Sequence, residues 1–341
     1  MNVKSGALAA AKPPQVKHLT VDAEDAERRL DRFLEAQCPG VPRTRIQRMI
    51  RTGEVRVNGG RAKGDRRLVA GDVVRIPPLH DAPPPSAEPV PLILPPIWRE
   101  RLQAAILVED AQILALNKPA GIAVHGGSGL AFGVIEALRV LRPDLPHLEL
   151  VHRLDRETSG CLVLAKSARI LRQLHTAFRT GTLEKEYLAL AVGDWSEGPA
   201  VHTAALAKSL VVGGERRVRL DPAGKEAITR FRPTERFRYA GLPLTLMEIH
   251  IETGRTHQIR VQAAAAGHPL AGDLKYGDDA ANRRLKAMGL GRLFLHARRL
   301  TLHLTGEEAP RRLVAPLPAD LRGFLERLRA GDEAAPGQDT G

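Results

Sequence analysis

The turn at residues 152–159, with the sequence HRLDRETS, places seven side chains that can donate, accept or carry charge between two apolar segments. A lone aspartate in such a turn commonly closes the turn or caps a helix. Seven functional groups in eight positions exceed what one turn needs, so we expect chemistry here, with Asp155 as the essential carboxylate. An ionised carboxylate can act as a general base or as a nucleophile.

Two other segments carry side chains suited to chemistry. Residues 253–260, TGRTHQIR, end a predicted strand and open a predicted helix. A helix N-terminus favours anions, so Arg255 and Arg260 could bind one, although they could equally be surface cations. Tyr187, one of only three tyrosines, begins a predicted strand. By itself it is equally compatible with a core or edge position.

The sequence argues against several familiar sites. His152, Asp155 and His257 could be imagined around a metal, but no two histidines have helical ligand spacing and no cysteine joins them, so we predict no metal. The Gly-x-Ser-x-Gly motif of serine hydrolases is absent. The glycine-rich loop at residues 126–129 lacks the Gly-Lys-Thr of a phosphate-binding loop. We therefore predict no cofactor.

The composition points to a polyanionic partner. The 341 residues include 51 Lys and Arg against 39 Asp and Glu, a net charge of +12. Such an excess suits nucleic acid or an acidic membrane surface. No apolar run reaches the roughly 18 residues of a spanning helix, and residues 6–11 are shorter than a signal-peptide core. With only Cys38 and Cys161, both expected to be inert, we predict no membrane association and a cytoplasmic location.

The first 80 residues contain a small α+β pattern. Leu30, Phe33 and Leu34 have helical spacing, and residues 46–50 repeat it in a segment that Gly53 can end. Residues 55–57 precede an Asn-Gly-Gly turn signal, and residues 73–76 form a second predicted strand.

Positive charge is concentrated in this part of the chain. Nine basic residues and two acids lie between positions 43 and 67, a net of +7. A solvated basic face is one interpretation. We favour RNA contact, because guanidinium groups spaced along one small surface can pair with successive phosphates. The expected contacts are Arg43, Arg45, Arg48, Arg51, Arg56, Arg61 and Lys63.

Proline and the apolar pattern divide the chain further. Nine prolines between positions 77 and 96 predict a stiff, extended connector. Beyond it, short β-like runs alternate with a few helical stretches, the clearest at 167–180, which indicates a mixed sheet with peripheral helices. We predict a flexible N-terminus (1–17), an RNA-binding domain (18–80), a linker (81–97), a main domain (98–329) and a disordered tail (330–341).

Residues 21–78 resemble the alpha-L RNA-binding domain first seen in a ribosomal small-subunit protein, also called the S4 domain. The resemblance lies in the pattern RLDRFLEAQCPGVPRTRIQRMIRTGEVRVNGG followed by AGDVVRI. It implies binding of structured RNA. Because no stacking aromatic residues are interleaved, shape and phosphate contacts should dominate over base reading.

The main domain resembles the RluA-type family of pseudouridine synthases, and most closely the member that acts on large-subunit ribosomal RNA. The resemblance is carried by LNKPAG at 116–121 with HGG at 125–127, HRLDRETSG at 152–160, GRTHQIRV at 254–261 and LFLHA at 293–297. It implies an α+β domain with a mixed, mainly antiparallel sheet. It also implies an isomerase that needs neither metal nor cofactor.

The same resemblance implies a role for each of six side chains. Asp155 would be the catalytic aspartate, Arg260 the cation paired with it, and Tyr187 the ring that packs on uracil. Arg153 would enter the RNA helix as the target base swings out. The implied pocket also includes its floor, Leu295, and the neighbouring His152.

The expected reaction converts uridine to pseudouridine in 23S ribosomal RNA. The N1–C1′ bond breaks, the uracil turns, and the ring rejoins through C5. The carboxylate can attack C1′ or remove a proton from C2′, and the sequence leaves both routes open. Two alternatives are a non-catalytic ribosome assembly factor that binds ribosomal RNA, and a pseudouridine synthase acting on transfer RNA. We expect a monomer.

Overall fold

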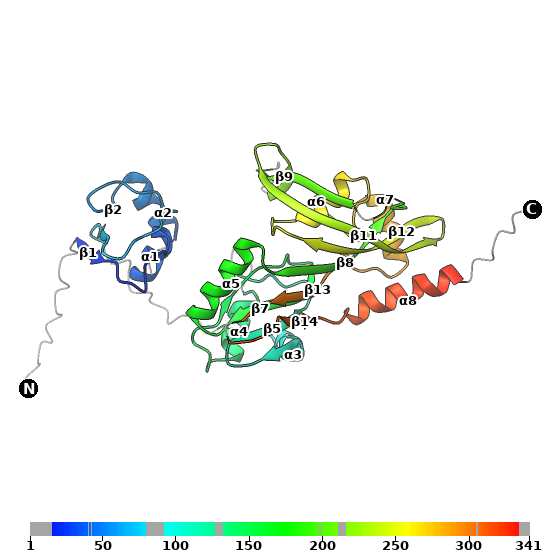
Figure 1. The fold of residues 1–341 in the computed structure, drawn as a ribbon, viewed down its shortest axis with the longest axis horizontal. Helices are drawn as coiled ribbons and strands as arrows, with labels where there is room; N and C mark the ends of the chain where they lie inside the picture. Colours follow the sequence, from blue (N-terminus) through cyan, green and yellow to red (C-terminus); the bar gives the residue numbers. More distant parts are fainter. Residues whose placement is uncertain are drawn as a thin grey trace, which may run out of the picture. The chain divides into compact units, whose positions relative to one another are not determined.

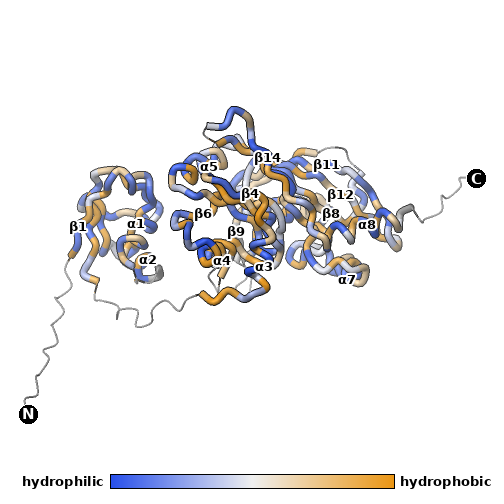
Figure 2. Tube along the Cα trace, turned by 90° about the horizontal axis from the view of Figure 1, so that it is seen from below, coloured by the Kyte–Doolittle hydropathy of each residue, from blue (hydrophilic) through white to orange (hydrophobic). Residues whose placement is uncertain are grey.

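The computed structural model describes residues 16–39, 41, 43–79, 92–126, 132–196, 198, 200–210, 216–304 and 306–333. The chain divides into two compact units, Met1–Pro91 and Leu92–Gly341 (Figure 1). Hydrophilic and hydrophobic residues are mixed along both units in Figure 2. Among the described residues, no helix combines the length and apolar character needed to cross a bilayer.

The first unit is a three-stranded sheet packed on two helices. Its sheet is antiparallel with the order β1-β3-β2. The helical stripes predicted from the sequence form its core, since Leu30, Phe33, Ile46 and Met49 are all buried. The elements are β1 (Lys17–Thr20), α1 (Leu30–Gln37), α2 (Arg43–Thr52), β2 (Arg56–Val57) and β3 (Val73–Ile76).

The Asn-Gly-Gly turn signal has the conformation expected of it. Asn58 and Gly59 have φ values of +50° and +77°, the left-handed geometry of a tight hairpin turn. The backbone amides of Val57 and Gly60 donate to each other's carbonyl oxygens at 3.0 Å. The turn therefore reverses the chain directly after β2.

The second unit contains one large sheet. Its main path has the order β10-β9-β11-β12-β8-β13-β7-β5-β4, with β14 paired to β13 and β6 to β7. The strands are β4 (Ile106–Glu109), β5 (Ile113–Lys118), β6 (Glu149–Leu150), β7 (Ser159–Ala165), β8 (Glu184–Val192), β9 (Ala200–Leu210), β10 (Arg216–Leu220), β11 (Lys225–Tyr239), β12 (Leu242–Ile251), β13 (Leu295–Leu302) and β14 (Arg311–Val314).

One strand pair makes this sheet mixed. β13 pairs with β7 in parallel, with His296 opposite Ser159, whereas the other described pairs are antiparallel. The two backbones approach closely at Gly160, where an added Cβ would lie 2.2 Å from the Ala297 carbonyl oxygen and where φ is +119°. Glycine is required at this junction, which brings the end of the Asp155 turn against β13.

Helices flank the sheet: α3 (Pro96–Ala104), α4 (Val134–Leu141), α5 (Ala168–Thr180), α6 (Gln258–Ala265), α7 (Asp279–Ala287) and α8 (Ala319–Glu333). The best-defined prediction, α5, is confirmed. Ser167 accepts a hydrogen bond from the Ile170 amide at its start, and Gly181 ends it with φ +74°.

Strand β8 lies in the middle of the sheet and contributes to both faces. Tyr187 and Ala189 pack in one apolar cluster with Ile259 of α6. Leu188 and Leu190 pack in another, with residues of α7 and α8. This alternation follows from the two-residue period of a strand. Consecutive side chains of β8 therefore lie in different environments on the two faces of the sheet.

Several predicted boundaries differ from the structure. Lys17, expected to be flexible, pairs in β1, and α3 begins at Pro96, inside the expected linker. Proline is well suited to the first turn of a helix, where its missing N–H is not needed. The C-terminal helix α8 continues to Glu333, beyond the predicted start of the tail. Residues 1–15, 80–91 and 334–341 lie outside the described residues.

The apolar run at residues 293–295, one of the short β-like runs beyond the linker, only partly coincides with a strand. Leu293 and Phe294 precede β13, which begins at Leu295 and continues to Leu302. The arginines of LHARRLTL obscured the strand, because they break the apolar run expected of a central strand.

Candidate active site

Asp155 lies in the turn between β6 and β7, and the neighbouring loop holds that turn in place. The Gly121 amide donates to the Arg156 carbonyl at 2.9 Å, and Arg156 Nε donates back to the Gly121 carbonyl at 3.0 Å. Lys118 also connects these two loops. These contacts make the backbone on either side of Asp155 part of a fixed structure.

Lys118 is fully buried at the end of β5. Its ammonium group donates to the carbonyl oxygens of Pro119, Ile122 and Arg156, at 2.8, 3.0 and 3.2 Å. Burial lowers the pKa of Lys118 to about 7, and the nearby charges of Glu157 and Asp155 oppose that shift. Three carbonyl oxygens match the three N–H donors of an ammonium group. Lys118 therefore holds the two loops together.

A small pocket of about 80 Å³ lies directly over Asp155. Residues from four separate parts of the chain line it: the 153–158 turn, strand β8, the start of α6 and the start of β13. Of the residues predicted from the sequence, it brings together Arg153, Asp155, Tyr187, Arg260 and Leu295.

Arg260 is the cation nearest to Asp155 on α6. Its Nη1 lies 3.7 Å from Asp155 Oδ2, which is an ion pair but longer than a hydrogen bond. Its direct partner is Asp273, whose two oxygens accept from Nε and Nη2 at 2.7 Å each. Burial lowers the pKa of Arg260, but the hydrogen bonds and charge of Asp273, together with the charge of Asp155, raise it overall. Arg260 is thus a fixed cation beside the carboxylate.

Asp273 was not anticipated from the sequence, although it completes the site. Its carboxylate is fully buried, and Oδ1 also accepts the amides of Lys275 and Tyr276 at 2.8 and 3.0 Å. Burial raises its pKa, but the guanidinium of Arg260 holds the pKa below its usual range. The polar cluster Gly272-Asp273 followed by Tyr276-Gly277 could have drawn attention to this loop.

Tyr187 approaches the pocket from β8. Burial raises the pKa of its phenol, and the negative charge of Asp155 adds to the rise. The hydroxyl therefore stays protonated at physiological pH. Ile251 and Leu295 line the same pocket, so part of its wall is apolar and can contact an aromatic ring.

His257 approaches Asp155 from the first turn of α6, and the sequence had suggested it only as a metal ligand. Its Nε2 lies 3.7 Å from Asp155 Oδ2. Its Nδ1 lies 2.7 Å from the Tyr276 hydroxyl. Burial lowers the pKa of His257, an effect that the Asp155 charge opposes. His257 and Tyr276 thus join the charged residues around the carboxylate.

A larger cleft of about 700 Å³ adjoins the pocket and shares Asp155, His257 and Arg260 with it. Arg153 is exposed and lines both cavities. The lining of the cleft is mainly basic, with His125, Arg153, Arg156, Lys275, Lys286 and Arg292 against Asp155 and Glu157. A cleft of this charge suits a phosphate backbone.

The prediction that His152 belongs to the pocket is wrong. Its ring stacks on Phe178 of α5 with centroids 4.9 Å apart, and its Nε2 accepts the Val163 amide at 3.1 Å. Burial lowers the pKa of His152 to about 3, so the ring is neutral. His152 therefore supports the turn from the side of α5. Its neighbour Arg153 faces the cavities instead.

The basic residues of the first unit lie mostly on its surface. Arg48, Arg51, Arg61 and Lys63 are exposed, and Arg45 and Arg56 are partly buried. Arg45 pairs with Glu54 at 3.1 Å. The side chain of Arg43 lies outside the described part of the chain. Helix α2 therefore buries its apolar side chains on one face and carries arginines on the other, as predicted.

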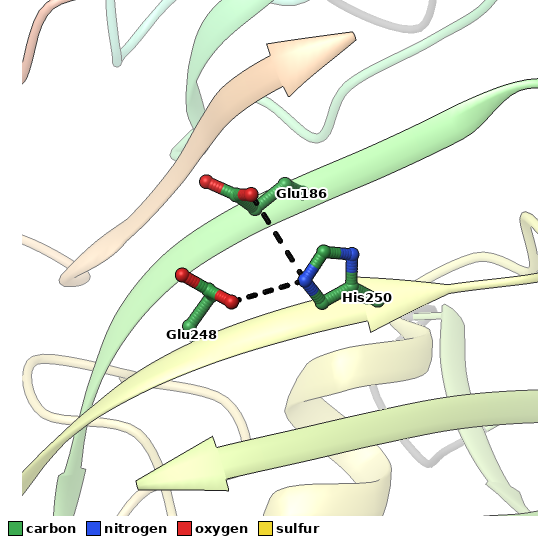
Figure 3. Close-up of side chains that lie close together, drawn as sticks. All are labelled: Glu186, Glu248 and His250. Atoms are coloured by element: carbon green, nitrogen blue, oxygen red, sulfur yellow. Dashed lines mark hydrogen bonds and ion pairs between the residues drawn. The ribbon is translucent and has the colours of Figure 1, made fainter. Parts of the chain in front are cut away.

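A second cluster of acidic and histidine side chains lies on the other face of β8. Glu186, Glu248 and His250 place ligand atoms within 4.8 Å of one another (Figure 3). Arginines already balance these carboxylates. Arg299 contacts Glu186, Arg298 lies 3.3 Å from it, and an Arg232 nitrogen lies 2.6 Å from Glu248. We interpret the cluster as an ion-pair network and not as a metal centre.

Comparison with known proteins identifies the class of this fold and site. The family described as RNA pseudouridylate synthase matches residues 112–265, and the S4 domain family matches residues 28–74. Two human structures are similar to it: RNA pseudouridylate synthase domain containing 4 (29% identity, 68% of this chain and 96% of that one, TM-score 0.54) and domain containing 1 (25%, 71% and 98%, 0.55). The chain belongs to the RNA pseudouridylate synthase family, of RluA type, with an N-terminal S4 domain.

Curated relatives that share one name are similar to the chain over most of its length. The protein named ribosomal large subunit pseudouridine synthase C is 48% identical in Pasteurella multocida (strain Pm70), over 92% of this chain and 94% of the relative. In Escherichia coli (strain K12) the protein of that name is 47% identical, over 93% of this chain and 98% of the relative. The similarity thus includes both units.

Proposed function

We propose that this protein isomerises specific uridines to pseudouridine in 23S ribosomal RNA. The observation that carries the proposal is the pocket over Asp155, in which a carboxylate, a fixed guanidinium and a neutral tyrosine meet. The relatives that match both units are named for the ribosomal large subunit. The N-terminal S4 domain supplies the basic surface that structured RNA requires.

Four of the predicted side chains act directly in the pocket. Asp155 acts on the ribose, as nucleophile at C1′ or base at C2′, while Arg260 keeps a positive charge beside it. Tyr187 holds the detached uracil by stacking, a contact worth about 1–3 kcal/mol. Leu295 closes the pocket beneath the ring. The hydrogen lost from C5 is balanced by the hydrogen gained at N1, so nothing is oxidised or consumed.

The target base must leave the RNA stack to reach this pocket. Extrusion costs a few kcal/mol, which a side chain entering the vacated space can offset. Arg153 is placed for that role because it is exposed and lines both the pocket and the adjoining cleft. We propose that the basic cleft holds the flanking phosphates while Arg153 replaces the base.

The proposal includes the setting of the reaction. Because the isomerisation is redox-neutral and breaks no phosphate bond, we propose that the enzyme needs no metal or cofactor. We further propose that it acts in the cytoplasm, as a monomer. The exposed Arg48, Arg51 and Lys63 of the S4 domain are the contacts we expect with RNA phosphates.

Carbodiimide-based mapping of pseudouridine in total RNA tests the proposal. Cells lacking the gene should lose specific pseudouridines in 23S ribosomal RNA. Wild-type protein should restore them, and Asp155→Asn should not. If pseudouridines were lost only from transfer RNA, the substrate would be transfer RNA and not 23S ribosomal RNA. If no RNA lost any pseudouridine, the protein would be a non-catalytic, RNA-binding assembly factor.

A further inference from the structure

His257 and Arg260 approach the same oxygen of the catalytic carboxylate. The shortest distance to Asp155 is 3.7 Å for each, from His257 Nε2 and from Arg260 Nη1, and both end on Oδ2. Arg260 is fixed by its two bonds to Asp273. His257 therefore occupies a second position beside Oδ2, and the question is whether it presents a proton or a lone pair there.

The Tyr276 hydroxyl decides which nitrogen of His257 carries the proton. This hydroxyl accepts the Val218 amide at 2.9 Å and lies 2.7 Å from His257 Nδ1. A phenol has one proton to donate, and Nδ1 is the acceptor beside it among the described residues. Burial lowers the pKa of His257, which favours the neutral ring. In that ring the remaining proton must lie on Nε2, facing Asp155.

The opposite tautomer would be unfavourable at both ends of the ring. A proton on Nδ1 would leave the phenol hydrogen without this acceptor. It would also turn the Nε2 lone pair toward a carboxylate oxygen, so two acceptors would face each other. The nearby cations Arg260 and Lys275 also lower the pKa of His257 and so favour the neutral ring, whereas the charges of Asp155 and Asp273 oppose them.

The backbone also indicates that the side chain of His257 matters. His257 has φ +54°, in the left-handed region that few non-glycine residues adopt, with asparagine, aspartate and histidine the most frequent among them. Its main-chain work is to accept the Val261 amide at 3.0 Å as α6 begins. Any residue supplies that carbonyl. A histidine in this conformation is therefore explained by what its ring contacts.

We propose that His257, held by Tyr276 in the Nε2–H tautomer, is a second positioning residue for Asp155. At 3.7 Å neither its N–H nor the Arg260 guanidinium is hydrogen-bonded to Oδ2 in the free protein. When the ribose enters, both close on this oxygen, which leaves Oδ1 as the oxygen that meets the ribose. The inference rests on the proposed pseudouridine synthase activity. It adds a neutral donor to the fixed cation, so the carboxylate is oriented without a second positive charge in the pocket.

Two substitutions at His257 separate donation from backbone strain. His257→Gln retains an N–H donor near the position of Nε2, whereas the amide of His257→Asn ends near the position of Nδ1 and cannot reach Asp155. Asparagine, like histidine, adopts positive φ more readily than glutamine. The Asn variant therefore has the better backbone, and any loss of rate in it reports the missing donor.

Single-turnover rates and RNA affinities of the full-length variants on a 23S ribosomal RNA transcript provide the first readout. His257→Asn should slow the reaction by about 10- to 100-fold, the factor expected for a hydrogen bond to a charged group, with the RNA Kd unchanged. His257→Gln should recover most of that loss. An Asn variant at the wild-type rate, or a Gln variant no faster than Asn, overturns the inference.

The tautomer provides a readout that does not depend on activity. Long-range ¹⁵N–¹H correlation spectra of the wild-type protein should show His257 protonated at Nε2 and unprotonated at Nδ1, with His257→Asn identifying the signal. Tyr276→Phe should yield a mixture of tautomers. A wild-type Nδ1–H signal overturns the inference alone. A wild-type protein that forms no pseudouridine in any RNA overturns the proposed function.

Discussion

Asp155 and Glu186 make an instructive pair, because both are acidic, both neighbour a histidine and arginines, and they lie near opposite faces of β8. Glu186 is directly paired with Arg299 and lies 3.3 Å from Arg298. The carboxylate of Asp155 stays 3.7 Å from both His257 and Arg260. Its side chain is 17% exposed, whereas that of Glu186 is 3% exposed.

The difference separates a carboxylate that stabilises the fold from one that is available for reaction. Glu186 has exchanged water for direct protein partners, so it has little capacity left for a substrate. Asp155 lies within reach of positive charge but keeps space for a ribose. In the active site the close ion pair is formed one step away, between Arg260 and Asp273. The proposed catalytic carboxylate and the structural one thus differ in how completely they are paired.

The largest expected effect is loss of activity in Asp155→Asn. The single-turnover rate should fall by about 10²–10⁴-fold or more, the range for removing a group that acts as base or nucleophile. Because Asp155 makes no close ion pair, the free energy of unfolding should change by about 0.5 kcal/mol or less. Rate measurements and urea unfolding of the same preparation check both parts. A destabilised variant would contradict the description of Asp155 as loosely held.

Asp273→Asn should affect both stability and rate. It removes the partner of a buried guanidinium, and breaking a buried ion pair in this way costs about 3–5 kcal/mol. The rate should also fall, since Arg260 loses its fixed position beside Asp155. Urea unfolding measures the first effect and single-turnover assays below the unfolding transition the second. Wild-type stability would show that the Arg260–Asp273 pair does not hold the site.

Glu186→Gln is the counterpart on the other face of β8. Its arginine partners are partly exposed, so we expect a loss of about 1–3 kcal/mol, below the full range for a buried pair. The rate at temperatures where the variant is folded should equal that of the wild type. A lower rate with unchanged RNA binding would mean that the two faces of β8 are coupled. It would contradict the distinction between a structural Glu186 and a reactive Asp155.

A further effect, on the pH dependence of stability alone, concerns a buried histidine that contacts no carboxylate among the described residues. His296 is fully buried between the Ser159 hydroxyl and the Ala315 carbonyl, each 3.0 Å away, and burial lowers its pKa to about 4. Between pH 6.5 and 4 the unfolded chain binds a proton that the folded ring does not. Stability should therefore fall as pH falls, by about 1.4 kcal/mol per pH unit from this residue.

Urea unfolding at pH 6.5, 5.5 and 4.5 checks this dependence against His296→Gln, which lacks a titrating ring. The wild-type curve should be steeper than that of the variant over this window and parallel to it above pH 7. Parallel curves throughout would mean that the His296 pKa is not lowered in the folded protein.

Local patterns were sufficient for much of the fold. The apolar spacing in α1, α2 and α5, the Asn-Gly turn and the glycine after α5 all depend on neighbours within a few residues, and each is confirmed. Strands β9, β10 and β11 were missed. β10 and β11 are rich in arginine and lysine and β9 is rich in alanine, so their apolar residues alternate too weakly for periodicity to reveal them.

The site divides in the same way. The sequence by itself indicated the family and the two domains, and it singled out Asp155, Tyr187 and Arg260, which line one pocket, because their motifs are short and dense in functional side chains. Only the tertiary structure decided which groups contact one another. It placed His152 against Phe178 and outside the pocket, and it gave Arg260 the partner Asp273. Which side chains contact one another depends on how distant segments of the chain pack. The distances and burial that result set each interaction, and no local sequence pattern encodes them.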